Sequence, residues 1–99
     1  MAEKMTNSYE TIFIIDASLE EDQIAAVKEK FTSLIAANGT VSNVDDWGKR
    51  RLAYEINDKT EGYYVLVDFE ADGEFPKELE RVYGITEGVL REIVVKKEA

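Results

Sequence analysis

The run SYETIFIID, from Ser8 to Asp16, constrains the fold of this chain most strongly because it is apolar on both of its faces. Side chains of an extended strand alternate between two faces, so Phe13 and Ile15 share one face and Ile12 and Ile14 share the other. Such a strand lies at the centre of a sheet, or its second face meets a partner. Either interpretation requires a sheet built around this segment by other strands of the chain.

A helix is predicted after this strand, over residues 19–38. Ser18-x-x-Glu21 has the spacing of a capping box, in which the serine oxygen accepts a hydrogen bond from an unpaired backbone N–H and the glutamate reaches back. Asn38-Gly39 predicts a left-handed stop at the end of the helix. The apolar residues that recur at spacings of three and four, and so form one buried face, are Ile24, Val27, Phe31, Leu34 and Ile35.

Three more strands and a second helix follow. The strands are predicted over residues 40–56, 61–70 and 88–97. The alternation of the first of these breaks near Asp45, Asp46 and Gly48, which predicts a bulge or a bend. Residues 57–62 are expected to form a hairpin loop. A proline in its first turn predicts a second helix over residues 76–83, which we expect Gly84 to end.

The order of elements, β-α-β-β-α-β, predicts an α+β protein of the ferredoxin-like class. In this class a four-stranded antiparallel sheet carries both helices on one face, with the first and third strands in the middle and the second strand at an edge. The other sheet face stays uncovered. The residues expected in the core beneath the helices are Phe13, Ile15, Ile24, Val27, Phe31, Leu34, Val65, Val67, Phe69, Leu79 and Val82.

Composition fits one domain with one core, because the chain has 99 residues of which 44% are hydrophobic. We expect that domain to span residues 8–97, after a flexible N-terminal segment at 1–7 and before a C-terminal end at 98–99. The absence of cysteine excludes disulfides and thiolate zinc sites and fits the cytoplasm. The sequence has no apolar run of 18 residues, so no membrane association is expected.

Three consecutive basic residues, Lys49, Arg50 and Arg51, stand out in a chain of net charge -9. Strand alternation predicts that Lys49 and Arg51 point to one face and Arg50 to the other. Bulk acidity repels phosphate at long range, but a local basic patch can still bind it, more weakly and with more sensitivity to salt. Composition alone favours a simpler interpretation, in which charges on an edge strand block pairing with another sheet. Trp47 and Tyr54 flank the triplet as aromatics do on RNA-binding surfaces, although large aromatics more often serve packing.

The sequence carries no catalytic constellation. It has no histidine or cysteine, its serines have no identifiable base, and it has no glycine-rich loop for phosphate. The neighbouring carboxylates at 20–22 and 45–46 lack a ligand loop, so no metal site is predicted. EGYYVLVDF, at 61–69, also matches the third-strand signature of RNA recognition motifs poorly. We therefore expect no enzymatic activity, no cofactor, no metal and no small-molecule substrate.

Four segments in this order and spacing resemble the bacterial small-subunit ribosomal protein six family: YETIFIID, DWGKRRLAYEI, EGYYVLVDFEA and VLREIVVKK. The most specific of them is WGKRRLAY, at 47–54, where Arg50 matches the family's arginine. Tyr9-Glu10 and Arg91 also agree with family positions. Glu55 departs from the pattern because the family usually has proline there, and the change adds an N–H donor and a negative charge to the strand.

The resemblance implies a non-catalytic ribosomal protein that binds 16S rRNA in the platform of the small subunit, as a heterodimer with ribosomal protein eighteen. A basic partner would offset the acidity of this chain. The expected RNA contacts are Lys49, Arg50, Arg51, Arg91, Lys96 and Lys97. The expected contacts with the protein partner are Ile12, Ile14, Trp47, Tyr54, Tyr64 and Leu66. A different class remains as the alternative: a ferredoxin-like regulatory module that binds a small metabolite or self-associates through its open sheet face.

Overall fold

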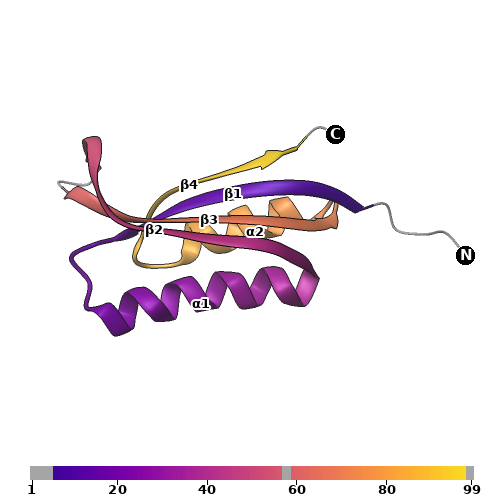
Figure 1. Cartoon of the computed structure of the whole chain (residues 1–99), viewed down its shortest axis with the longest axis horizontal. Helices are drawn as coiled ribbons and strands as arrows, with labels where there is room; N and C mark the ends of the chain where they lie inside the picture. Colours follow the sequence, from indigo (N-terminus) through magenta and orange to yellow (C-terminus); the bar gives the residue numbers. More distant parts are fainter. Residues whose placement is uncertain (1–5, 57–58, 98–99) are drawn as a thin grey trace, which may run out of the picture.

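The computed structural model describes residues 6–56 and 59–97, which form six elements. In chain order these are β1 (Thr6–Asp16), α1 (Glu21–Asn38), β2 (Gly39–Ile56), β3 (Lys59–Asp72), α2 (Phe75–Ile85) and β4 (Val89–Lys96). The sheet is antiparallel, with strand order β2-β3-β1-β4. Both helices lie on the same side of it (Figure 1). The predicted ferredoxin-like arrangement is confirmed, with the triplet on the edge strand β2.

The core fills the space between the sheet and the two helices. Phe31 of α1 is fully buried, with its ring centroid 4.2 Å from that of Tyr83 in α2 and 5.4 Å from that of Phe13 in β1. One aromatic side chain therefore ties both helices to the central strand. The predicted core residues all belong to this cluster or pack against it, with Val27, Leu34 and Val82 half-buried at its margin.

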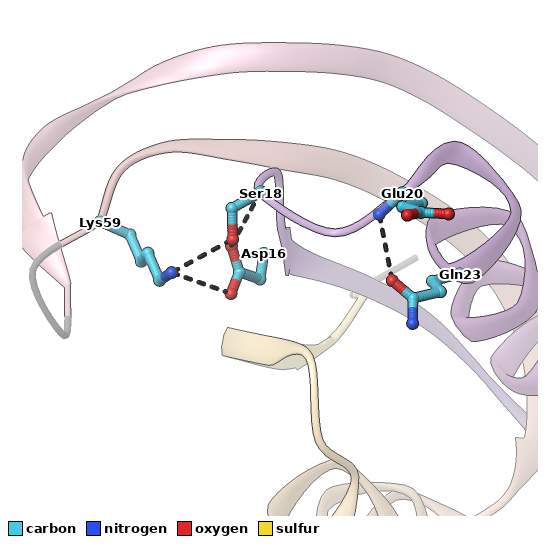
Figure 2. A network of polar contacts seen from close by, with 5 residues as sticks. All are labelled: Asp16, Ser18, Glu20, Gln23 and Lys59. Atoms are coloured by element: carbon cyan, nitrogen blue, oxygen red, sulfur yellow. Dashed lines mark hydrogen bonds and ion pairs between the residues drawn. The ribbon is translucent and has the colours of Figure 1, made fainter.

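The start of α1 differs from the prediction, because Ser18 does not cap the helix. The helix begins two residues later than predicted, at Glu21, and the backbone N–H of Glu20 donates to Oε1 of Gln23 at 3.1 Å (Figure 2). The hydroxyl of Ser18 instead donates to Oδ1 of Asp16 at 2.7 Å. Oδ1 of Asp16 also accepts the backbone N–H of Ser18 at 2.9 Å, so Ser18 closes the turn after β1, and Glu20 and Gln23 form the capping box of α1 instead.

Lys59 joins this turn from the start of β3. Its ammonium donates to the Ser18 hydroxyl oxygen at 3.1 Å and lies 3.5 Å from Oδ2 of Asp16 (Figure 2). Partial burial works to raise the pKa of Asp16, but the hydrogen bonds from Ser18 and the charge of Lys59 outweigh it and hold the pKa below its ordinary value. Because β3 begins at Lys59, residues 59–62 belong to this strand rather than to the predicted hairpin loop. Residues 57–58 lie outside the described residues.

Two glycines have roles other than those predicted. Gly39 does not stop α1 in a left-handed conformation: its φ of -171° is extended, and it begins β2. A Cβ at this position would lie 2.0 Å from the backbone oxygen of Glu70, so glycine is needed for the close approach of β3. Gly84 does not end α2, which continues to Ile85. The ends of the chain also differ slightly, since Thr6 and Asn7 belong to β1, while residues 1–5 and 98–99 lie outside the described residues.

Candidate RNA and protein interface

A bulge in β2 sets the direction of the basic triplet. The register with β3 shifts between Asp46 and Gly48, and Gly48 has a φ of 76°. The insertion of Trp47 as the unpaired residue confirms the bulge predicted here. Oδ1 of Asp46 accepts the backbone N–H of Gly48 at 3.0 Å and so closes the bulge.

The other oxygen of Asp46 ties the bulge to the helical layer. Oδ2 accepts the hydroxyl of Tyr63 at 2.6 Å and the ammonium of Lys28, from α1, at 2.7 Å. Partial burial of Asp46 opposes ionisation, but these two bonds outweigh it and lower the pKa of the carboxyl group. The bond to Asp46, with burial, raises the pKa of Tyr63 to about 12. At neutral pH the Asp46 carboxyl group is therefore ionised and the Tyr63 hydroxyl group is protonated.

Beyond the bulge, the three basic residues alternate between the two faces of the edge strand, as predicted. Lys49 and Arg51 lie opposite Tyr63 and Glu61 of β3, and Arg50 lies opposite Gly62. Directly paired residues share a face, so Arg50 is on the open face and the other two are on the helical side. All three are exposed. Within residues 6–56 and 59–97, no carboxylate lies within ion-pair distance of any of them.

Trp47 links Arg50 to the open face. The Nε of Arg50 donates to the backbone oxygen of Trp47 at 3.4 Å, and its Cζ lies 5.9 Å from the centre of the indole ring. The indole stacks on Tyr64 of β3, with ring centroids 6.1 Å apart and an interplanar angle of 16°. Trp47 remains partly exposed rather than entering the core. Trp47 therefore lies between Arg50 and Tyr64 and contacts both side chains.

The far end of the β2-β3 hairpin turns away from the helices, above the open face (Figure 1). Tyr54 of β2 accepts a hydrogen bond from Arg91 of β4 at 2.5 Å, and the Arg91 guanidinium lies 5.4 Å from the centre of the tyrosine ring. Leu52 is buried here, and a Cβ on Gly62 would meet its Cδ2 at 3.2 Å and Cγ2 of Ile14 at 2.3 Å. The missing side chain at Gly62 lets the hairpin cover this part of the sheet.

The structure does not bring the six predicted RNA contacts together. Arg91 lies opposite Ile14, whereas Lys96 lies opposite Tyr9, five residues further along β4 and roughly 17 Å away. Lys97 forms an ion pair with Asp68 at 2.7 Å. The basic residues thus fall into two groups, one at the hairpin and one at the end of β4.

The predicted partner residues lie on the open face but differ in exposure. Ile12, Tyr64 and Leu66 are half-buried. The Ile14 side chain is only 8% exposed because other residues of the same chain cover it. Sequence reasoning did not select Ile93 and Val95, which are 49% and 48% exposed on β4. The alternation of VLREIVVKK places both on the same face as Arg91, so that pattern could have identified them.

These features define a class of protein: a ferredoxin-like domain with an open apolar sheet face and an exposed basic edge strand. In the described part of the chain, no group of three histidine, cysteine, aspartate or glutamate residues is placed to hold a metal ion. None of the described helices is long and apolar enough to cross a membrane.

Comparison with known proteins gives the family. The sequence profile described as ribosomal protein S6 matches residues 8–96, and the chain belongs to this family. It is 57% identical to the small ribosomal subunit protein bS6 of Clostridium perfringens over 91% of this chain and 96% of that protein. With bS6 of Clostridium botulinum the identity is 53%, over 91% of this chain and 97% of that protein.

A solved structure from the same family has the same fold as this chain. The 30S ribosomal protein S6 from Thermotoga maritima superimposes with a TM-score of 0.88 at 29% identity, covering 94% of this chain and 89% of that one. The chain is therefore a structural protein of the small ribosomal subunit rather than an enzyme, located in the ribosome of the cytoplasm. This confirms the family, the fold and the non-catalytic role expected from the sequence.

Proposed function

We propose that the chain binds 16S rRNA in the platform of the small subunit, as a heterodimer with ribosomal protein eighteen. The observation that carries this proposal is the free basic edge beside an open apolar face. The triplet of β2 is exposed and has no carboxylate partner among the described residues. Exposed cations without partners are the groups that phosphates attract, and they position a protein on RNA without reading its sequence.

The open sheet face is the proposed contact with ribosomal protein eighteen. Ile12, Tyr64 and Leu66 are half-buried there, beside the exposed Ile93 and Val95. Apolar side chains that gather on an exposed sheet face are typical of a protein interface. A basic partner would be attracted by the net charge of -9, and the heterodimer would repel RNA less than this chain does alone.

The side chains proposed to contact RNA differ in the protein groups that they already bind. Lys49, Arg50 and Arg51 meet phosphates directly, with Arg50 favoured because a guanidinium can bind phosphate through two parallel hydrogen bonds. Arg91 contributes while it is bound to Tyr54, which leaves further N–H donors on its guanidinium. Lys96 and Lys97 form a second, separate group, in which Lys97 exchanges Asp68 for phosphate.

A binding titration tests the proposal. A 16S platform fragment is titrated with this chain alone, with ribosomal protein eighteen alone, and with both. We expect this chain to bind tightly only in the presence of ribosomal protein eighteen, because neither its few cations nor its net charge supports binding alone. Equal affinity of this chain in the absence of its partner, or no complex with both, would contradict the proposal.

A pair of variants tests the partner face. Leu66→Asp places a charge on the open face and should weaken binding to ribosomal protein eighteen. Ile85→Asp is the control, since Ile85 is 68% exposed at the end of α2. Calorimetry should show a loss only for Leu66→Asp, with both variants folded by circular dichroism. Unchanged affinity for Leu66→Asp would count against this face.

A further inference from the structure

The open face contains a hollow of about 230 Å³. Its lining includes Ile12, Ile14, Trp47, Tyr64, Arg91 and Ile93. Since β1 lies between β3 and β4 in the sheet, its two isoleucines form the floor, with Tyr64 of β3 on one side and Ile93 of β4 on the other. Trp47 comes from the bulge of β2. Three neighbouring strands and a bulge thus build one concave site.

The surface exposed within the hollow is apolar and its walls are held in place, although the charged Arg91 and Glu92 are also among the lining residues. Trp47 stacks on Tyr64, which gives one flat aromatic wall, and Arg50 lies against the indole. Arg91 also lines the hollow, and its guanidinium is bound to Tyr54 at the end of the hairpin. A concave apolar site with walls fixed before binding suits an occupant without charge.

The size of the hollow selects the kind of occupant. Pockets for small molecules usually enclose about 300–1,000 Å³, so this one is small for a metabolite. It has room for one large side chain, and such pockets commonly receive the anchor residue of a protein interface. The chain carries a net charge of -9, which favours a cationic protein over an acidic one.

We propose that this hollow receives a single aliphatic or aromatic side chain from a cationic protein partner and anchors that partner on the open face. The inference rests on the proposed function and deepens it: ribosomal protein eighteen would bind mainly through one residue seated between Trp47 and Ile93. The surrounding contacts of the face then exclude water and contribute less to affinity.

Two substitutions on one strand provide the test. Ile93→Phe fills the hollow, whereas Val95→Phe makes a similar change two residues along the same face of β4, outside the lining. The two parent residues are almost equally exposed, at 49% and 48%. Binding of ribosomal protein eighteen is followed by the fluorescence of Trp47, the single tryptophan of the chain and part of the wall.

We expect Ile93→Phe to weaken binding about tenfold or more and Val95→Phe less than about threefold. Ile93→Ala, which removes a wall instead of filling the hollow, should also weaken binding and replaces Ile93→Phe if that variant does not fold. Equal losses at 93 and 95, or no loss at 93, would overturn the anchor while leaving the heterodimer in place. No binding by the parent chain would overturn the proposed function as well.

Discussion

At the scale of single residues, space rather than backbone angle explains why glycine occupies position 39. Its φ is extended, a conformation that any residue can adopt, but the backbone of Glu70 leaves no room for a Cβ. Gly84, within α2, is different because a Cβ there would meet nothing within 4 Å. The same substitution should therefore act in opposite directions at the two positions.

We predict that Gly39→Ala destabilises the protein by about 1–3 kcal/mol, because β2 and β3 must separate to admit the methyl group. Gly84→Ala should stabilise it by about 0.5–1 kcal/mol, since alanine loses less entropy than glycine in a helix. Urea unfolding of the two variants measures both changes in free energy. A stable Gly39→Ala variant would show that the strands approach less closely than described.

The Asp46 cluster makes a pH-dependent contribution to stability. The pKa of Asp46 is lowered in the folded protein, so its contribution is present above the unfolded pKa, near 4, and is lost as the pH falls through the folded value. Because Asp46 and Lys28 are partly exposed, we expect this contribution to be about 1 kcal/mol or less.

The hydroxyl of Tyr63 is one of the groups that lower this pKa. Tyr63→Phe should raise the pKa of Asp46 toward its ordinary value and reduce the stability gained between acidic and neutral pH. Tyr64→Phe is the control, because Tyr64 is on the opposite face of β3. Carboxyl carbon NMR titrations of both variants measure the pKa directly. An unchanged value in Tyr63→Phe would exclude the hydrogen bond to Asp46 as a cause of the shift.

At the scale of elements, the end of the β2-β3 hairpin is a separate unit that covers part of the open face. Leu52 is buried over Gly62, and Tyr54 contacts Arg91 on the far strand. The regular pairing of β2 with β3 is interrupted between Arg51 and Ile56, so the stability of this end depends strongly on those contacts.

We predict that Leu52→Ala loosens this end without unfolding the sheet. Backbone amides of residues 50–56 and 59–62 should exchange about tenfold faster, while those of β1 paired with β3 stay protected. Glu55→Ala, an exposed change in the same strand, should leave both regions close to the parent. Uniformly faster exchange in Leu52→Ala would show instead that the hairpin unfolds together with the core.

The sequence predicted the elements and the sheet order well because periodicity is a local property of each segment. The α1 stripe that contains Phe31 and the alternation in β1 each point to one buried face without knowledge of the rest of the chain. The roles of Ser18 and Gly39 differ from the sequence prediction because they depend on Lys59 and Glu70, which are distant in sequence. A motif within one segment carries no information about neighbours that are distant in sequence.

The candidate site was predicted only in part for the same reason. The bulge near Gly48 and the alternation of the triplet follow from local sequence and are confirmed. The burial of Ile14 and the contact between Tyr54 and Arg91 arise because the hairpin turns over the sheet, whereas the hollow arises where the bulge of β2 brings Trp47 beside β1, β3 and β4. That turn depends on the missing side chain of Gly62, which a strand pattern alone does not reveal.

At the scale of the whole molecule, charge is distributed unevenly. Residues 47–56 hold three basic and one acidic residue, and the rest of the chain is strongly acidic. The summed field repels RNA at a distance, whereas the triplet attracts phosphate only at close range. We therefore expect the triplet to contact RNA after the heterodimer has formed, once the partner has offset the net charge.

The most direct test of this account is the affinity of the heterodimer for its 16S fragment, measured for Arg50→Glu across a range of salt concentrations. Lys77→Glu is the control, because it makes the same charge change at an exposed position of α2. Arg50→Glu should weaken binding and reduce the slope of log affinity against log salt by about one, while Lys77→Glu keeps the parent's slope. If Arg50→Glu retains the affinity and slope of the parent, the triplet is a solvated edge and does not contact RNA.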